Sequence, residues 1–143
     1  MNRRELLWGT AGLTATLFAT NDALAKADRE GDEHDHNHDG CVDTCQECAE
    51  ECLECVDHCI TELAAGHVDH ADCVRYCLDC ADVCHLCASV MNRGGPNAKS
   101  ISKLCAEICE LCAAQCEKFK NDEHCVECAK TCRNCAAECR EMK

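Results

Sequence analysis

The sequence predicts an all-α fold, an antiparallel up-down-up-down four-helix bundle with a cysteine-lined core. Two observations carry this prediction. Twenty of the 143 residues are cysteine, and they fall into four groups in which successive cysteines are three or four residues apart, in strict alternation. This is the heptad spacing of helices that pack side by side, with cysteine where leucine usually lies. The breaks between the groups carry residues that end or cap helices, so each group predicts one helix.

The four groups define a cysteine seam, one stripe of thiols along each predicted helix. They comprise Cys41, Cys45, Cys48, Cys52, Cys55 and Cys59; Cys73, Cys77, Cys80, Cys84 and Cys87; Cys105, Cys109, Cys112 and Cys116; and Cys125, Cys128, Cys132, Cys135 and Cys139. Between the cysteines lie mainly Ala, Glu, Leu and Lys, which are good helix formers. We therefore expect helices near residues 41–64, 70–92, 98–119 and 122–141.

Each break contains residues that favour a change of direction. Gly66 and Asp69 predict a helix stop and an N-cap in the first break, and residues 92–97 read Asn-Arg-Gly-Gly-Pro-Asn in the second. Asn121 and Asp122 supply capping side chains in the third. Because the connections are short, consecutive helices should run antiparallel.

The composition limits both the core and the partners. Beyond the first 25 residues the only aromatic side chains are Tyr76 and Phe119, so a conventional core is thin. Buried cysteine compensates in part, and bound metal would add its binding free energy to folding. The net charge of −13 argues against a nucleic-acid partner, because phosphates would be repelled. Most of this acidity is expected to keep the surface solvated.

Residues 1–25 resemble a cleaved export signal. Arg3 and Arg4 precede a mildly apolar stretch that is too short to span a bilayer, and residues 23–25 form a small-x-small cleavage site. Paired arginines before a weakly hydrophobic run are typical of a twin-arginine signal, and an ordinary secretory signal is the alternative. The prediction is export of the folded protein to the periplasm, with no membrane span after the signal is removed.

Residues 26–40 are predicted to be a disordered linker that precedes the bundle domain at residues 41–143. His34, His36 and His38 lie at alternate positions in it and could hold Cu(II), Zn(II) or Ni(II) loosely; a plain solvated linker is the alternative. His38 lies three residues before Cys41, so it could also cap the end of the first stripe.

Extending the heptad beyond the cysteines predicts weak ligands at one end of the bundle. Met91 follows Cys87 by four residues and Met142 follows Cys139 by three. In an antiparallel bundle these two methionines share one end, and weak thioether ligands suit an entrance through which Cu(I) passes inward. We favour this end as the entrance. Ordinary packing of methionine near helix ends is the competing interpretation.

The opposite end is the alternative entrance. His70 lies three residues before Cys73 on the extended seam and is a candidate entrance ligand. The same end is expected to gather His67, His124 and the apolar Phe119. His58 and His85 lie off the seam and are expected on the surface. The competing interpretation is again that these histidines are solvated.

Two apolar residues lie outside the stripe that one core requires. Leu53 and Ile60 are displaced from the cysteine seam of the first helix. We expect them to pack against a neighbouring helix; self-association of the bundle is the alternative.

The donor set favours Cu(I). Thiolate-only sites suit Cu(I), Zn(II) and iron–sulfur clusters. Zinc needs four converging ligands, usually from knuckles and loops, and iron–sulfur clusters are wrapped by loops, so evenly spaced helical thiols fit neither well. Cu(I) accepts two or three thiolates that can bridge ions, and each ion cancels one buried negative charge. By ligand arithmetic the twenty thiols would hold roughly 10 to 20 Cu(I) ions and release protons on binding.

Two other functions for the cysteines are weaker. A disulfide scaffold scatters cysteine through loops, and pairs on successive turns of one helix lie farther apart than the about 3.8 Å that bridged Cβ atoms need. Catalysis normally uses one activated thiol with a general base, and no cysteine is singled out in this way. Strand patterns, glycine-rich phosphate loops and metal-hydrolase motifs are absent from the sequence. We therefore expect a metal-binding protein and no enzyme.

The pattern resembles the cysteine-rich four-helix-bundle copper storage protein family. The Cys-x-x-x-Cys-x-x-Cys runs that begin at Cys41, Cys73 and Cys105, with a shifted run from Cys125, carry the resemblance over about residues 41–140. It implies Cu(I) storage with the cysteines as ligands, twin-arginine export in some members, and a homotetramer of bundles. The spacing leaves open whether outermost cysteines such as Cys41 and Cys139 point inward, and the histidine-rich linker is not part of the motif.

Two further hypotheses remain open at the level of sequence. One is a metallothionein-like protein that sequesters several metals, zinc and cadmium included. The other is a transfer protein that delivers copper to an exported cuproenzyme or receives it from a copper chaperone. Copper storage and copper detoxification use the same binding chemistry, so the sequence does not distinguish between these two functions.

Overall fold

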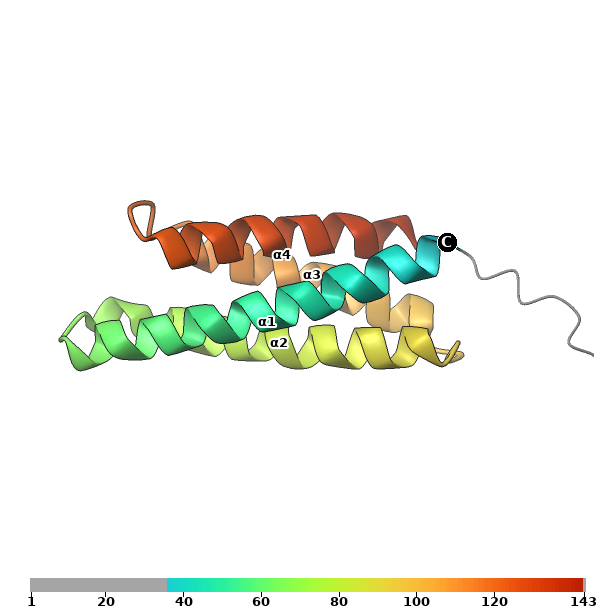
Figure 1. Cartoon of the computed structure of the whole chain (residues 1–143), viewed down its shortest axis with the longest axis horizontal. Helices are drawn as coiled ribbons and strands as arrows, with labels where there is room; N and C mark the ends of the chain where they lie inside the picture. Colours follow the sequence, from blue (N-terminus) through green and yellow to red (C-terminus); the bar gives the residue numbers. More distant parts are fainter. Residues whose placement is uncertain (1–35, 143) are drawn as a thin grey trace, which may run out of the picture. The chain divides into compact units, whose positions relative to one another are not determined.

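The computed structural model describes residues 36–142, and these form four α-helices with no strand among them. The helices are α1 (His36–Ala64), α2 (Ala71–Asn92), α3 (Ala98–Cys116) and α4 (Glu123–Glu141), and a short 3₁₀ helix, η1 (Val68–His70), precedes α2. Consecutive helices run in opposite directions (Figure 1), which confirms the predicted up-down-up-down bundle.

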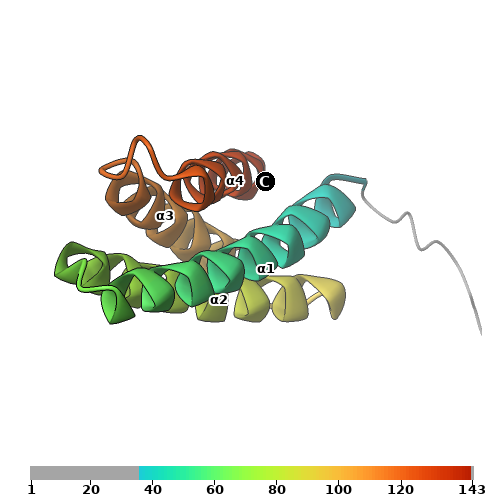
Figure 2. The same cartoon turned by 60° about the vertical axis from the view of Figure 1, so that its left-hand side comes forward.

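Each helix packs against two neighbours around the core. α1 packs against α2 and α4, and α3 packs against the same two helices. The diagonal pairs meet through thiols in the core, as between Cys45 of α1 and Cys105 of α3. Figure 2 shows the same arrangement from a second direction. The bundle therefore has two distinct ends. The α1–α2 and α3–α4 connections meet at one end, and the α2–α3 connection meets the start of α1 and the close of α4 at the other.

The helix bounds differ from the predicted ones at three points. α1 begins at His36 instead of residue 41, so the last residues of the predicted linker are helical. α3 ends at Cys116, which leaves Phe119 in the turn before α4. Asp69 was wrongly predicted as the N-cap of α2, because residues 68–70 form a 3₁₀ turn and place His70 at that position. The rest of the predicted linker and the predicted export signal lie outside the described residues.

The core consists mainly of cysteine and alanine, with Val42, Val56 and Met91 beside them. All twenty cysteines are buried, including the outermost Cys41 and Cys139, so the predicted seam faces inward along its whole length. The small side chains that fill the space beside the seam are Ala49, Ala81, Ala88, Ala106, Ala113, Ala129 and Ala136. Because these side chains are small, they leave little room for larger ones between the helices.

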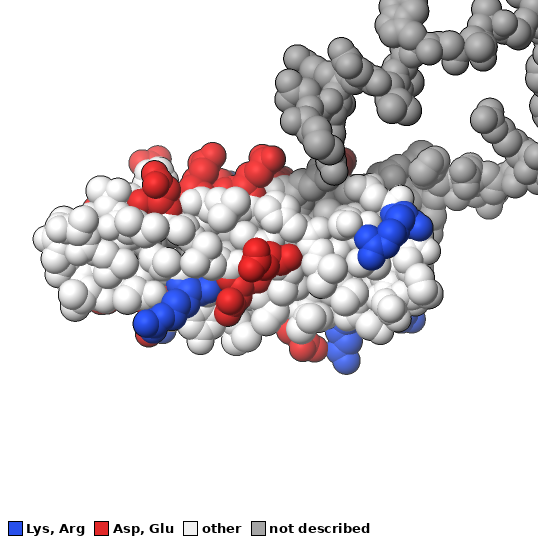
Figure 3. Space-filling model, turned by 90° about the horizontal axis from the view of Figure 1, so that it is seen from below, with Lys and Arg blue, Asp and Glu red and all other residues white. Residues whose placement is uncertain are grey.

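Larger aliphatic side chains therefore lie on the outside. Leu53 and Ile60 are 44% and 51% exposed, so the prediction that they pack against a neighbouring helix was wrong. Leu78, Leu86, Leu104 and Leu111 are exposed as well. On the face shown in Figure 3, charged side chains are scattered and leave wide uncharged areas between them. None of the described helices is long and apolar enough to cross a membrane.

Candidate metal centre

Every cysteine of the bundle carries a free, buried thiol. The alternation of three- and four-residue spacings turns each thiol towards the axis, because these positions lie on one face of an α-helix. Within one helix, successive stripe members come close, as in the Sγ–Sγ distances of 4.0 Å for Cys73–Cys77 and 3.9 Å for Cys105–Cys109. Each helix thus presents a ladder of sulfur atoms to its neighbours.

Thiols from different helices approach even more closely. The Sγ atoms of Cys41 on α1 and Cys139 on α4 are 3.2 Å apart, although the residues are 98 positions apart in the chain. The Cys73–Cys116 distance between α2 and α3 is 3.4 Å. Such distances are longer than the about 2.05 Å of a disulfide bond, and they bring two sulfurs within reach of one ion.

Groups of four thiols converge at successive levels of the core. In each group all four sulfur atoms lie within 4.8 Å of one another. The groups include Cys41, Cys45, Cys87 and Cys139; Cys45, Cys84, Cys105 and Cys135; Cys48, Cys80, Cys84 and Cys109; Cys48, Cys52, Cys80 and Cys132; and Cys52, Cys112, Cys128 and Cys132. Evenly spaced helical thiols were expected to fit a four-ligand site poorly, but facing helices bring four sulfur atoms together in each of these groups.

Among the described residues, the core contains no buried lysine or arginine side chain. Its buried polar side chains are His70, Ser102 and Gln115. Neighbouring thiols therefore control each other's ionisation. The pKa of Cys52 is raised by its contacts with Cys112 and other thiols and by burial, and Cys105 with burial raises the pKa of Cys84. The hydrogen bond with Cys105 lowers the pKa of Cys45 to about 6. A thiolate in this core is therefore stabilised by neighbouring thiols that keep their protons. A bound cation would stabilise thiolates directly, so that neighbouring cysteines could be ionised together.

The histidine end, formed by His58, His67, His70, His124 and Phe119 at the α1–α2 and α3–α4 connections, closes one end of the core. His70 is buried, its ring stacks on Phe119 with centroids 4.2 Å apart, and neither ring nitrogen makes a hydrogen bond. The nitrogens lie 3.4 and 3.5 Å from oxygens of Asp69 and Asp122, too long and poorly aligned for hydrogen bonds. The predicted gathering of His67, His70, His124 and Phe119 is confirmed.

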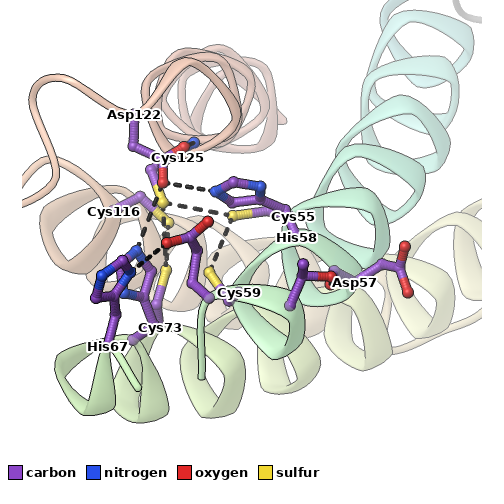
Figure 4. Close-up of polar contacts among 12 residues, drawn as sticks. Cys55, Asp57, His58, Cys59, His67, Cys73, Cys116, Asp122 and Cys125 are labelled. Atoms are coloured by element: carbon purple, nitrogen blue, oxygen red, sulfur yellow. Dashed lines mark hydrogen bonds and ion pairs between the residues drawn. The ribbon is translucent and has the colours of Figure 1, made fainter. Parts of the chain in front are cut away.

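His58 belongs to this end as well. Its Nε2 lies 2.6 Å from Asp122 Oδ2 (Figure 4), and its ring stacks on His124 with centroids 4.5 Å apart. The expectation of a plain surface position was therefore wrong. The other Asp122 oxygen accepts a hydrogen bond from the Cys125 N–H and caps α4. Burial alone would raise the pKa of Asp122, but the bonds from His58 and the Cys125 N–H outweigh it and lower that pKa. His85, by contrast, is exposed as expected.

The methionine end, formed by Met91 and Met142, lies at the α2–α3 connection. Met91 is buried in the core and Met142 packs against it while remaining partly exposed. Ser102 is buried near the start of α3 and donates a hydrogen bond of 2.5 Å to the Cys139 carbonyl, which ties α3 to the last turn of α4. The two methionines thus reach the end of the seam as predicted. The side chain of His38 lies outside the described residues.

The comparison with protein families decides how this core is classified. The family model for copper storage proteins matches residues 22–143. The chain belongs to the copper storage protein family. None of the curated proteins searched matches it.

Solved structures of this family share the bundle. The Cu(I)-bound copper storage protein BsCsp3 is 37% identical, with 74% of this chain and 97% of that chain covered at a TM-score of 0.69. Apo copper storage protein 3 from Bacillus subtilis is 36% identical, with 73% and 96% covered at a TM-score of 0.64. The Streptomyces lividans copper storage protein loaded with 10 copper equivalents is 31% identical, with 82% and 91% covered at a TM-score of 0.69.

Sequence reasoning on this copper storage protein missed two features of the site. His58 was set aside because it lies one residue from the seam, yet that flanking position turns it towards the α4 N-terminus. Ser102 was missed because a lone serine near a helix start carries no distinctive signal. Its position three residues before Cys105, on the extended heptad, is the signal that could have found it.

Proposed function

We propose that this protein stores multiple Cu(I) ions inside its bundle through cysteine thiolates. The observation that carries the proposal is the core itself: twenty buried free thiols, with cross-helix Sγ–Sγ distances from 3.2 to 4.0 Å, fill the space where a bundle normally packs leucine. Membership of the copper storage protein family supports the proposal, as do the Cu(I)-loaded structures to which the chain is similar.

The chemistry of Cu(I) suits this core better than that of a harder ion. A soft monovalent ion accepts two or three thiolates, and one sulfur can bridge two ions, so neighbouring thiols 3 to 4 Å apart can be used continuously along the axis. Each Cu(I) replaces one thiol proton and leaves the net charge of the core unchanged. This matters because a buried charge without a partner is very costly. All twenty cysteines are proposed ligands.

The ends of the bundle are the proposed routes for copper. At the methionine end, Met91 and Met142 offer weak thioether ligands next to the Cys41 and Cys139 thiols. At the histidine end, the unpaired ring nitrogens of His70 offer a second set of weak ligands. A Met91→Ala, Met142→Ala double variant and a His70→Ala variant, compared for the rate of Cu(I) loading, test the two routes. The entrance is the end whose variant slows loading, and unchanged rates in both discard these ligands.

The remaining parts of the chain complete the proposal. Residues 1–25 direct export to the periplasm by the twin-arginine route, residues 26–40 link signal and bundle, and residues 41–143 bind metal without catalysing a reaction. Copper ions are the partners, and a cuproenzyme or a copper chaperone would exchange them. The exposed aliphatic side chains Leu53 and Ile60 support assembly into a homo-oligomer, a tetramer by family resemblance. Substituting both with Ser should shift the sedimentation coefficient to that of the monomer.

The decisive experiment is an anaerobic titration of the fully reduced protein with Cu(I) against a competing chromogenic chelator. Tight binding of roughly ten or more equivalents per chain, with helical circular dichroism throughout, is the expected result. Saturation after one to four equivalents of Cu(I) would exclude copper storage as the function. Rapid release to an added acceptor ligand would instead favour copper transfer to a cuproenzyme.

A further inference from the structure

We propose that the same core has a second, divalent mode of loading, in which quartets of thiolates hold Zn²⁺ or Cd²⁺ in tetrahedral sites that Cu(I) later displaces. The proposal extends the storage function above to a second class of cargo, but it rests on the geometry of the quartets alone.

The sulfur positions already match a tetrahedral zinc site. Four thiolates at about 2.3 Å from Zn²⁺ form a tetrahedron whose edges are about 3.8 Å long. In the quartet at the methionine end, the Cys41–Cys45, Cys41–Cys139 and Cys45–Cys139 distances are 4.0, 3.2 and 3.6 Å. The fourth member, Cys87, lies within 4.8 Å of each of them. Small side-chain rotations would bring the four sulfurs to the required positions.

The same spacing recurs at the middle of the bundle. Cys48 and Cys52 lie 3.7 Å from Cys132, and Cys80 lies 3.9 Å from it, within one quartet. Each of these five quartets draws its ligands from three or four different helices, so the ligands do not depend on a loop that must fold around the ion. Preorganised ligands lose little conformational entropy on binding, which favours occupation.

Quartets that share no cysteine set the capacity. Three of the quartets can be filled at once: Cys41, Cys45, Cys87 and Cys139; Cys48, Cys80, Cys84 and Cys109; and Cys52, Cys112, Cys128 and Cys132. These quartets alone hold three divalent ions with one full set of thiolates each. Twenty thiols taken in fours hold at most five, which is far fewer than the proposed number of Cu(I) ions.

Charge makes this mode weaker than copper loading. A divalent ion with four thiolates leaves a net charge of −2 in a core without a buried Lys or Arg among the described residues. Cu(I) leaves no such excess when it replaces protons one for one. Because an uncompensated buried charge is costly, Cu(I) should displace Zn²⁺ or Cd²⁺ quantitatively, and the divalent ions should not displace Cu(I).

Co²⁺ is the probe for this mode, because its tetrahedral thiolate complexes show intense visible d–d bands and sulfur-to-metal charge transfer. The reduced full chain is titrated with Co²⁺ without oxygen, and then with Zn²⁺ and with Cu(I). We expect about three to five equivalents with tetrahedral thiolate spectra, bleached by both later ions. A His34→Gln, His36→Gln, His38→Gln variant, which removes the histidines that precede the first cysteine, should keep these bands.

Two double variants with equal numbers of thiols test the quartets themselves. Of these five quartets, Cys52→Ser with Cys132→Ser removes two and leaves two that share no cysteine, whereas Cys45→Ser with Cys52→Ser removes four and leaves one. The second variant should therefore lose more Co²⁺ than the first. Equal losses, or weak spectra of oxygen and nitrogen ligands only, would overturn the proposal. If the wild-type protein fails the Co²⁺ test but still takes up ten or more Cu(I) ions, the proposal of copper storage stands. If it binds neither Co²⁺ nor Cu(I), copper storage is excluded as well.

Discussion

At the histidine end, a single side chain links two helices, in addition to the contacts between their cysteines. Asp122 caps α4 with one carboxylate oxygen and binds His58 of α1 with the other. It therefore fixes the axial position of α4 against α1, and with it the level at which Cys55 and Cys125 meet at 3.9 Å. The placement of one carboxylate thus helps to set the geometry of nearby thiols.

Replacing Asp122 separates these two roles. Asp122→Ala removes the cap and the His58 partner, so we expect the free energy of unfolding of the apo protein to fall by about 1–2 kcal/mol in urea denaturation. Asp122→Asn keeps a side-chain oxygen for the Cys125 N–H and should lose less than half of that. An alanine variant as stable as the parent would show that the cap does not contribute.

The thiols also make the apo protein sensitive to alkaline pH. The pKa values of Cys52 and Cys84 are raised above the ordinary 9.0, by Cys112 and Cys105 first and then by further thiols and burial. In the unfolded chain these groups ionise near pH 9, whereas in the folded core they stay neutral. Their contribution to stability is thus complete below pH 9 and is lost as the pH rises.

We expect the apo protein to lose about 1.4 kcal/mol per pH unit above 9 for each thiol that stays neutral. Urea denaturation at several pH values between 7 and about 10.5 under reducing conditions measures this slope. Cu(I)-loaded protein, whose thiolates are already bound, is the control and should show little dependence. A stability of the apo protein that rises above pH 9 would contradict the sign.

At the scale of elements, the helices are defined more by their ends and by alanine than by large apolar side chains. Gly66 ends α1 with φ +100°, a left-handed conformation that reverses the chain towards η1. Alanine beside the seam lets the helices approach closely enough for thiols to meet across the axis. Leu53 and Ile60 stay outside for the same reason.

A substitution at Gly66 tests the turn in isolation. A Cβ at this position would meet no atom within 4 Å, so Gly66→Ala adds only the backbone strain of the left-handed conformation. We expect a loss of about 1–2 kcal/mol in the free energy of unfolding with an unchanged helical spectrum. The matched control is Gly40→Ala, which lies in α1 and would place its Cβ in ordinary contact, 3.5 Å from Glu138. Equal effects of the two variants would exclude the strain.

At the scale of the whole molecule, a core of thiols couples stability to cargo. The seam replaces leucine with a smaller side chain, so the apo protein gives up apolar burial that a conventional bundle would have. Metal ions bound between the helices compensate for this lost stabilisation, because any ligand that binds only the folded state stabilises that state.

Copper loading should therefore raise the melting temperature. At a free Cu(I) concentration of about 1,000 times the dissociation constant, a single site adds about 4 kcal/mol, and several sites add more. Thermal melts followed by circular dichroism at zero, five and ten equivalents should show a stepwise rise, reversed when a strong Cu(I) chelator strips the metal. A melting temperature independent of loading would mean that the copper lies outside the folded core.

The sequence by itself determined the fold class, the inward direction of the cysteine stripes short of their outermost members, and most of the residues that gather at each end. It could do so because heptad spacing encodes a helix face, and capping residues such as Asp122 encode helix ends, within one short segment. Tertiary structure alone decided which thiols meet, such as Cys41 with Cys139, and it also decided that Leu53 stays exposed and that His58 reaches Asp122. These features depend on the axial register and rotation of one helix against another. Contacts between segments far apart in the chain determine this register and rotation, and a local sequence pattern does not encode such contacts.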